Sequence, residues 1–416
     1  MENKIDWLSL LLYGAIVFFG WLNIYAACYD ESHAALFDFS TRHGKQLIWI
    51  GISLVIALVI ALTDPRIFSS TAYIIYLVVL GLLVVVLFIG SVIKGGQSWI
   101  DLGPFRFQPS EFAKFATALA LAKYMSSIDL DYRQLRSKVL AWTLILVPAA
   151  LILLQHDTGS ALVFASFLLP LYREGMSGNI LLLGLAAVVL FVLALLVNQF
   201  IIIGALAAIG LFYLYVWLNK RTRKHYVWVT TLFLAASLFT LSVDFAFEHV
   251  LEQHQRDRIY VLLGKTQDTK NTGYNQYQSK IAIGSGGLTG KGFLNGTITK
   301  ADFVPEQETD FIFCTVGEEW GFVGSTIVIL AYIGLLLRLV RLAERQYSKF
   351  SRFYGYCVAS ILFFHFLVNI GMVLGLLPVI GIPLPFFSYG GSSLMAFTIL
   401  LFIFLRQDQE RTTKPL

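Results

Sequence analysis

Acidic residues gather in the stretch 301–321, ADFVPEQETDFIFCTVGEEWG, of a chain that is otherwise strongly apolar. Five carboxylates flank or interrupt the run 311–317, which is apolar apart from Thr315. They are Glu306, Glu308, Asp310, Glu318 and Glu319. A carboxylate at the mouth of a membrane segment is costly to hold ionised, so it is paired, hydrated or used in a reaction.

Asp310 is the last acid before the apolar run and is therefore the most exposed to desolvation. If Pro305 opens a helical turn, Glu306 and Asp310 lie four residues apart on one face. Repulsion and partial desolvation both make a carboxylate a stronger base, which a reaction near neutral pH requires. We therefore expect Asp310 to be a catalytic base that Glu306 tunes. The alternative is an acidic, solvated helix start that the helix dipole favours.

The segment 108–114, QPSEFAK, combines a helix start with an acid and a base. Proline followed by serine predicts the start, with Ser110 as the N-cap. Glu111 and Lys114 are three residues apart and share a helix face. A lysine near a helix N-terminus suits an anionic phosphate. The alternative is a helix-terminal ion pair with a snorkelling lysine.

Upstream of this helix, Trp99 could line a sugar or lipid surface, although a single interfacial tryptophan is often only a membrane anchor. Downstream, the run 278–292, QSKIAIGSGGLTGKG, contains five glycines and two lysines, Lys280 and Lys291. Glycines let a backbone turn tightly and approach a ligand closely. A flexible surface loop is the alternative. A dinucleotide fingerprint is excluded, because no strand is predicted before the run.

A broken stretch at 377–393, LPVIGIPLPFFSYGGSS, separates the last two apolar segments. Its prolines and Gly381 interrupt helical structure, and irregular backbone at membrane depth is tolerated only where it is buried in protein or lines a wet cavity. The run SYGGSS offers hydroxyls and free backbone amides, as binding sites do. We therefore expect Ser388, Gly390 and Gly391 to bind substrate, although a plain turn would have the same composition.

The composition is that of a polytopic membrane protein, with 57% hydrophobic and 14% charged residues, against roughly 25% charged in soluble proteins. Three dispersed cysteines indicate neither a disulfide framework nor a metal motif. No cleavage site follows the first apolar segment, so we expect it to remain as a helix. Twelve apolar segments are candidate helices. They are 7–27, 45–63, 70–93, 111–126, 138–154, 159–172, 179–197, 200–218, 226–244, 313–337, 353–377 and 385–405.

Loop charges predict the orientation of these helices. Lys and Arg gather at 133–138, 220–224, 338–352 and 406–414, which places these segments and both termini in the cytoplasm. The segments 94–110, 155–160, 245–310 and 377–393 then share the opposite face. Within the long loop 245–310, residues 247–263 have apolar residues at helical spacing and predict an amphipathic surface helix. No ATP-binding loop is present, so any chemistry uses an energised substrate.

The chain resembles the SEDS family of bacterial membrane proteins (RodA, FtsW and SpoVE). The resemblance rests on five segments that follow in order and span nearly the whole chain. They are KGGQSWIDLGPFRFQPSEFAK, DTGS, YNQYQSKIAIGSGGLTGKGF, FVPEQETDFIFCTVGEEWGFVG and VNIGMVLGLLPVIGIPLPFFSYGGSS. The sequences NIGM and PVIGIPLP resemble those of the elongation branch of the family.

This resemblance implies an enzyme of the bacterial cytoplasmic membrane that polymerises lipid II, a disaccharide-pentapeptide on undecaprenyl pyrophosphate, into peptidoglycan strands. It implies that Asp310 is the essential acid and that Trp99, Glu111 and Lys114 are functionally sensitive. The implied partners are a class B penicillin-binding protein and MreC/MreD-type elongation machinery. Residues 1–416 would form one transmembrane domain.

One departure from the family pattern lies between the DTGS helix and the long loop. The family usually has ten helices and one helix in this interval, whereas three apolar segments occur here. We therefore expect an inserted two-helix hairpin within 179–244, joined at 197–200 and peripheral to the active cavity. An insertion of two helices leaves the long loop on the outer face.

The reaction expected from the resemblance is displacement at the donor sugar's anomeric carbon by a hydroxyl of the acceptor, with Asp310 as base. Cations should stabilise the departing pyrophosphate, and Lys114, Lys280 and Arg106 are the candidates, with Gln278 and Ser279 also in the binding region. Asp310 and Glu306 could hold a divalent Mg or Mn ion, which the sequence does not require. The rival functions are a lipid II flippase and a non-catalytic scaffold. A flippase should carry charges deep in its helices. Here His365 is the ionisable residue near the middle of a predicted helix, and such a histidine is more often a packed, hydrogen-bonded core residue than a functional one.

Overall fold

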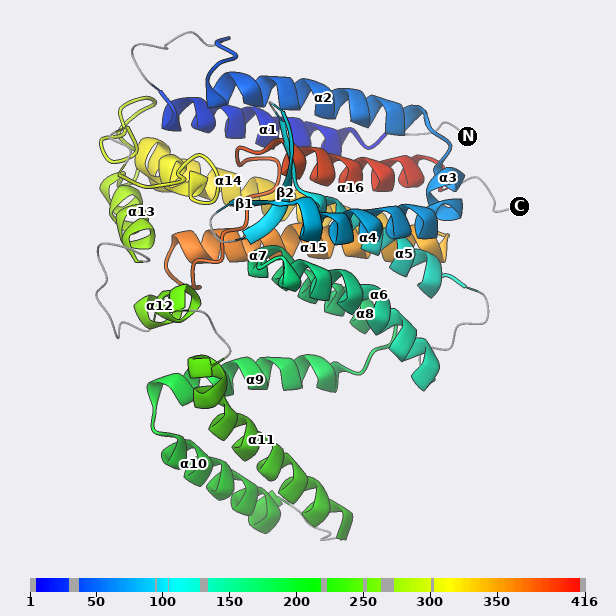
Figure 1. Cartoon of the computed structure of the whole chain (residues 1–416), viewed down its shortest axis with the longest axis vertical. Coiled ribbons are helices and arrows are strands. Elements are labelled where there is room, and N and C mark those ends of the chain that lie inside the picture. The colour runs from blue at the N-terminus through cyan, green and yellow to red at the C-terminus, as the bar shows by residue number, and fades with distance from the viewer. Residues whose placement is uncertain are drawn as a thin grey trace. The chain divides into compact units, whose positions relative to one another are not determined.

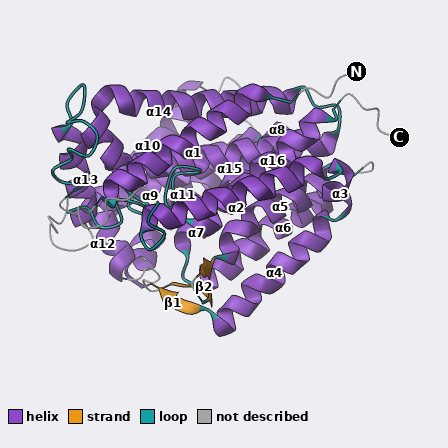
Figure 2. Ribbon diagram, turned by 90° about the horizontal axis from the view of Figure 1, so that it is seen from above, coloured by secondary structure: helices purple, strands orange, loops and turns teal. Residues whose placement is uncertain are grey.

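The computed structural model describes residues 5–29, 37–93, 96–103, 105–127, 134–217, 223–249, 253–262, 273–300 and 303–411. Helices make up most of this part of the chain (Figure 2). They group into two compact units, residues 1–175 with 274–416, and residues 176–273. The first unit contains every candidate site residue named above.

The larger unit is a helix bundle in which α1 begins and α16 ends at the same end (Figure 1). Its elements are α1 (Trp7–Ala27), α2 (Arg42–Leu62), α3 (Pro65–Ser70), α4 (Ala72–Ile89), α5 (Pro109–Met125), α6 (Leu135–Leu154), α7 (Thr158–Val163), η2 (Phe164–Phe167), α8 (Leu168–Arg173), α13 (Tyr274–Ser285), α14 (Ile312–Glu344), α15 (Lys349–Val373) and α16 (Gly391–Gln409). The centre of the bundle is α15, which packs against α5, α14 and α16.

Side-chain size explains which helices are central. In α5 the run ATALALA is buried, because small residues allow neighbouring backbones to approach closely. The most apolar 18-residue window of α15 is 83% buried, whereas those of α2 and α4 are 22% and 28% buried. The helices α2 and α4 carry large apolar side chains on their open faces, as expected for contact with lipid.

Three short antiparallel strands precede α5, although the sequence predicted no strand and assigned 91–93 to an apolar helical segment. They are β1 (Ser91–Ile93), β2 (Gly96–Leu102) and β3 (Phe105–Phe107), in the order β1-β2-β3. Trp99 pairs with Ser91, and Asp101 pairs with Arg106. The strands follow α4 and lead directly into α5, so they set where α5 begins. That start is Pro109 with Gln108 as N-cap, and the prediction that Ser110 caps the helix is wrong.

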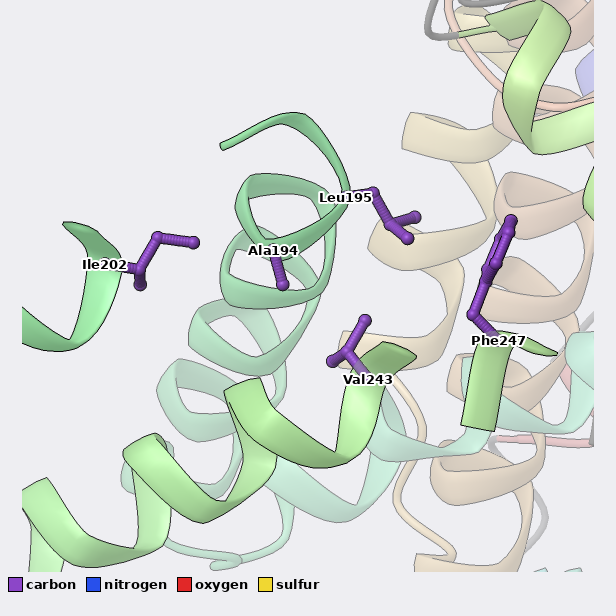
Figure 3. Close-up of a cluster of buried hydrophobic side chains, with 5 residues drawn as sticks. All are labelled: Ala194, Leu195, Ile202, Val243 and Phe247. Carbon is purple, nitrogen blue, oxygen red and sulfur yellow. The ribbon is translucent and has the colours of Figure 1, made fainter. Parts of the chain in front are cut away.

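The smaller unit consists of α9 (Gly178–Leu196), α10 (Gln199–Phe212), η3 (Tyr213–Trp217), α11 (Arg223–His249) and α12 (Gln253–Leu262). Both α9 and α10 pack against α11. A small apolar core joins them through Ala194, Leu195, Ile202, Val243 and Phe247 (Figure 3). The three predicted apolar segments of 179–244 are therefore helices with their own core. That the inserted hairpin lies away from Asp310 stays a prediction.

Nine helices in the described part of the chain are long and apolar enough to cross a membrane: α1, α2, α4, α6, α9, α11, α14, α15 and α16. The expectation of an all-helical polytopic protein is confirmed. Each of the twelve predicted segments contains helical residues, although 91–93 form β1 and 385–390 form no helix. Three of the segments fall short of a full span. Of these, α5 has 17 residues, 159–172 is broken into α7, η2 and α8, and α10 ends in a π-helical turn.

The predicted amphipathic helix 247–263 is formed in two pieces. Its first residues continue α11 to His249, and α12 covers Gln253–Leu262. Residues 250–252 and 263 lie outside the described residues. The glycine-rich run also begins inside a helix, because α13 extends over Tyr274–Ser285. Gln278, Ser279 and Lys280 are therefore helical residues rather than loop residues.

Candidate functional site

Asp310 lies in a turn that is hydrogen-bonded along the broken segment between α15 and α16. The Asn369 amide on α15 donates to the carbonyl oxygens of Asp310 and Ile382, each at 2.8 Å. The Ser388 hydroxyl donates to the Thr309 carbonyl at 2.6 Å. Two chain segments that are far apart in sequence therefore form one structure around Asp310.

The Asp310 carboxylate lies directly against the backbone at Gly381. A Cβ atom at Gly381 would lie 3.2 Å from Asp310 Oδ2, and Gly381 has φ +78°. Both the space and the left-handed backbone favour glycine there. The half-buried position of Asp310 agrees with the predicted partial desolvation. At this glycine the broken segment passes close to the carboxylate.

The predicted helical turn that places Glu306 and Asp310 on one helix face is not formed. Residues 304–311 form successive turns, and α14 begins only at Ile312. Glu306 has φ +63°, an uncommon backbone conformation for a residue other than glycine. Its carbonyl accepts hydrogen bonds from the backbone of Thr309 and Phe311, at 3.0 and 3.3 Å. The turn is therefore held by its backbone, and the helix-face argument for Glu306 no longer applies.

Glu111, Lys114 and His365 form a fully buried chain of polar contacts. The Lys114 ammonium lies 2.7 Å from Glu111 Oε1 and 2.9 Å from His365 Nε2. The other ring nitrogen, Nδ1, lies 3.2 Å from the Pro383 carbonyl oxygen. The three side chains are 3%, 2% and 0% exposed. Lys114 thus pairs with Glu111 as the ion-pair alternative required, but it lies inside the bundle and does not snorkel.

The tautomer of His365 follows from its two partners. The Pro383 carbonyl can only accept a hydrogen bond, so Nδ1 must carry the proton that reaches it. The ammonium of Lys114 donates, so Nε2 is the acceptor. The ring is therefore neutral with its proton on Nδ1, and it links α5 to the broken segment. His365 is a hydrogen-bonded core residue, as expected.

A second polar network holds the start of α5 to α7 and α16. Asp157, the N-cap of α7, accepts from the Ser160 amide at 2.9 Å, from Gln108 Nε2 at 3.0 Å and from the Ser110 hydroxyl at 3.2 Å. At the start of α16, the Ser392 hydroxyl donates to the Arg106 carbonyl at 3.2 Å. The DTGS turn therefore fixes where the β3–α5 junction lies.

The predicted binding glycines at the start of α16 have packing partners. A Cβ atom at Gly391 would lie 2.4 Å from the Trp49 ring, and the Gly390 amide donates to Gln46 Oε1 at 3.2 Å. Ser388 is likewise used within the protein, since it accepts from the Leu384 amide at 2.9 Å and donates to the Asp310 turn. These residues shape the site even where they do not bind substrate.

The glycines of the 278–292 run approach the backbone of α14 closely. Gly321 breaks α14 with φ +63° and ψ −159°, which leaves helical backbone groups without intrahelical partners. The loop supplies them, since the amides of Phe322 and Val323 donate to the Gly287 and Leu288 carbonyls. A Cβ atom at Gly290 would lie 2.0 Å from the Glu319 carbonyl oxygen. The close approach that these glycines predicted is thus made to the protein's own helix.

Glu318 anchors the same loop from within α14. Its side chain is 0% exposed, and its two oxygens accept from the backbone of Thr297, Ile298 and Thr299 and from Lys291. Glu319, beside it, is also buried. Glu318 therefore holds α14 against the loop. The Lys291 ammonium is paired with Glu318.

The remaining predicted residues lie at separate places around the bundle. Trp99 is half-buried on β2. The Arg106 side chain is 62% exposed and pairs with Asp101 at 3.2 Å. Ser279 on α13 is buried and donates to the Val373 carbonyl at 3.1 Å, and Gln278 is half-buried. Lys280 is exposed, and its side chain passes over Gly375 at the end of α15.

Two important residues were not singled out for the site by sequence reasoning. Asn369 joins Asp310 to Ile382, and His365 joins Lys114 to Pro383. Their four-residue spacing on α15 puts both on one helix face. Two hydrogen-bonding side chains on one face of an apolar helix, followed by a proline-rich break, were the available signal. Irregular backbone within a membrane needs such donors.

Comparison with known proteins identifies the chain's relatives. A family model described as "Cell cycle protein" for FtsW, RodA and SpoVE matches residues 6–203 and 204–413. The peptidoglycan glycosyltransferase MrdB of Escherichia coli K12 is 37% identical over 347 residues, 83% of this chain and 80% of that protein. The peptidoglycan glycosyltransferase RodA of Treponema pallidum is 32% identical over 417 residues, 94% of each chain.

Solved structures agree with the sequence matches. A chain from work on the structural coordination of polymerization and crosslinking by a peptidoglycan synthase complex is similar at a TM-score of 0.73 and 29% identity. The Rod shape determining protein RodA of Thermus thermophilus is similar at a TM-score of 0.65 and 27% identity. Both matches cover 99% of each chain. The protein therefore belongs to the FtsW/RodA/SpoVE family, the SEDS family of multi-pass membrane proteins that its motifs indicated.

Proposed function

We propose that this protein is a peptidoglycan glycosyltransferase that polymerises lipid II for cell-wall elongation. The relatives of highest identity quoted above are peptidoglycan glycosyltransferases. The observation that carries the proposal is the Asp310 carboxylate, held half-buried against Gly381 in a turn bonded to the broken segment. A base that is fixed in this way is suited to take a proton from a hydroxyl nucleophile.

In the proposed reaction, the acceptor's 4-hydroxyl oxygen forms a bond to the anomeric carbon of the donor sugar. The bond from that carbon to the lipid pyrophosphate breaks, and the pyrophosphate leaves with the electron pair. Asp310 takes the hydroxyl proton. Direct displacement inverts the configuration at the sugar carbon.

Lys280 is the leading candidate for binding the departing pyrophosphate. Its side chain is exposed on α13 beside Gly375, and a cation there would stabilise the charge that develops on the leaving group. Lys114 is already engaged by Glu111 and His365, and Arg106 is paired with Asp101. We therefore place Lys280 first, and assign Lys114 to the support of the site. The other binding candidates are Trp99, Gln278, Ser279, Ser388, Gly390 and Gly391.

A divalent ion would have to share its ligands with the substrate. Among the residues that the structure describes, no group of three or more His, Cys, Asp or Glu side chains is placed to hold a metal. Mg²⁺ commonly binds through one or two carboxylates plus phosphate oxygens and waters. Asp310, with Glu306 as a second candidate, would hold such an ion only together with the pyrophosphate.

We also propose the finer topology. The nine long apolar helices, together with α5, the α7–α8 segment and α10, would make twelve crossings, with both termini in the cytoplasm and the Asp310 turn on the outer face of the bacterial cytoplasmic membrane. The positions of α1 and α16 in the larger unit are compatible with this arrangement (Figure 1). The partner would be a class B penicillin-binding protein, with MreC/MreD-type elongation proteins. A peptidoglycan synthase complex among the structural neighbours supports such a partner.

The test uses purified protein with and without its cognate class B penicillin-binding protein, given lipid II in Mg²⁺, Mn²⁺ or EDTA. Glycan strands resolved on a gel are expected. Asp310→Asn should yield none, whereas the matched control Asp64→Asn should polymerise normally. Asp64 lies just after the C-terminal end of α2 and caps α3. Asparagine caps a helix about as well as aspartate does. No strands, together with transport of lipid II across vesicles, would instead identify a flippase. Neither activity would leave a scaffold.

A further inference from the structure

Two polar side chains on one face of α15 hold consecutive carbonyls of the broken segment. Asn369 donates to the Ile382 carbonyl at 2.8 Å, and His365, one turn earlier, reaches the Pro383 carbonyl at 3.2 Å. Residues 374–390 form no helix, so these carbonyls have no helical partner. Both side chains are 0% exposed. In a site closed to water, such bonds set the path of the backbone.

The same backbone passes directly beside the Asp310 carboxylate. Gly381 precedes Ile382 and Pro383, and its Cβ position lies 3.2 Å from Asp310 Oδ2. Asn369 also donates to the Asp310 carbonyl. A shift of residues 381–383 would therefore move the wall against which Asp310 rests. His365 controls the end of this tripeptide that Asn369 does not hold.

The buried ion pair determines which proton His365 offers. Lys114, fixed by Glu111 at 2.7 Å, occupies the Nε2 side of the ring at 2.9 Å. The proton must then reside on Nδ1, where it meets the Pro383 carbonyl. The edge-on Phe397 ring, with its centroid 4.8 Å from that of His365, limits rotation of the imidazole. Glu111 and Lys114 thus act on the broken segment through the histidine.

We propose that His365 is a positioning residue, through which the buried Glu111–Lys114 pair fixes the backbone 381–383 and thereby the Asp310 carboxylate. The proposal rests on the proposed function of Asp310. It assigns Lys114 a task that does not require it to touch the substrate. It also explains why a charged pair is kept in the centre of the bundle, where a purely apolar pair would pack without a desolvation cost.

Two substitutions separate the two hydrogen bonds of His365. In His365→Asn the amide nitrogen takes the place of Nδ1 and can still donate to the Pro383 carbonyl. In His365→Gln the amide oxygen takes the place of Nε2 and can still accept from Lys114, but the bond to the Pro383 carbonyl is lost. Polymerisation of lipid II is measured at several concentrations in the complex with the penicillin-binding protein. We expect His365→Gln to lower kcat at least about tenfold, because small misplacements of catalytic groups cost up to about 100-fold. His365→Asn should keep at least about a third of the wild-type kcat. KM should change less than about threefold in both variants, since His365 is not proposed to bind substrate.

Equal losses in the two variants, no loss in either, or a loss confined to KM would overturn the proposal. Thermal unfolding is measured alongside, because a merely structural role would make activity follow the unfolding midpoint. The wild-type protein supplies an independent test, in which solid-state ¹⁵N NMR should show one buried histidine with the Nδ1–H tautomer that is missing from the spectrum of either variant. An Nε2–H signal in its place would also overturn it. Asp310→Asn distinguishes failure of the proposed function from failure of this inference. An active Asp310→Asn enzyme contradicts the proposed function. An inactive one, together with equal activities of His365→Gln and His365→Asn, contradicts only this inference.

Discussion

Replacing Glu318 by glutamine should loosen residues 297–299, the part of the loop after α13 that the Glu318 carboxylate holds against α14. Glu318 Oε1 accepts from the amides of Thr297 and Ile298 at 2.9 and 3.0 Å and from the Lys291 ammonium at 2.6 Å. Its Oε2 accepts from the amide and hydroxyl of Thr299 at 2.9 and 2.8 Å. Glutamine has one acceptor oxygen, so its NH₂ group must face donors at one of these two positions.

The magnitude follows from the bonds that are lost. The less costly orientation keeps the oxygen on Thr297 and Ile298 and leaves the buried Thr299 amide without its acceptor, which costs about 1–3 kcal/mol. The bond from Lys291 also loses its charged partner, and hydrogen bonds to charged groups contribute about 1.5–3 kcal/mol, roughly twice a neutral bond. Together the local loss is about 2–4 kcal/mol, which corresponds to roughly 30- to 1,000-fold in the opening equilibrium of the loop.

Hydrogen exchange followed by mass spectrometry measures this directly. Peptides that cover 297–299 should exchange at least about 30-fold faster in Glu318→Gln than in the wild type, because exchange follows the local opening free energy. Peptides from α5 should be unchanged and serve as the internal control. Unchanged exchange at 297–299 would refute the claim that this carboxylate anchors the loop. Faster exchange throughout the protein would mean that Glu318 supports the whole bundle instead.

Three further predictions concern the rest of the larger unit. Lys114→Met should destabilise the protein by about 3–5 kcal/mol, because it leaves a buried carboxylate unpaired, whereas the double variant with Glu111→Gln should recover most of the thermal unfolding midpoint but not the activity. Gly290→Ala should lower that midpoint, because φ is +81° and the new Cβ atom would meet the Glu319 carbonyl at 2.0 Å; an unchanged midpoint would contradict this. Burial acts to raise the pKa of Asp6, but its bonds to Arg338 and Ser9 outweigh burial and hold the pKa below its ordinary value. The folded state should therefore gain stability from Asp6 above about pH 4 and lose it as the pH falls further, and Arg338→Met should reduce this acid-dependent change in unfolding midpoint.

Much of the helical arrangement could be predicted from the sequence, because apolar runs of membrane length leave few alternatives. The boundaries were set by features that hydropathy does not describe. The segment 159–172 is interrupted by a 3₁₀ turn, η2, although most of its residues are apolar. The strands before α5 are short, β2 begins with Gly96, and Gly103 follows its end, so their pairing depends on the bundle end on which they lie.

The candidate site was likewise predicted only in part. Asp310 could be selected from the sequence because its charge is unusual beside an apolar run. The spacing of Asn369 and His365 was a signal for its surroundings, but the backbone carbonyls of residues 382 and 383 on which they act carry none. The backbone at Glu306 was predicted wrongly for a related reason. A positive φ at a glutamate has no compositional signature, so a helical turn was the natural expectation.

The proposed function requires that the Asp310 carboxylate acts as the base in glycosidic bond formation. Single-turnover formation of that bond, with lipid II binding measured in parallel on the same Asp310→Asn protein, tests it most directly. If Asp310 is the base, the variant should bind lipid II within about threefold of wild type and form the bond about 10²–10⁴ times more slowly, the usual contribution of a general base. A rate within tenfold of wild type at saturating lipid II, or a loss that weaker binding fully explains, would contradict it.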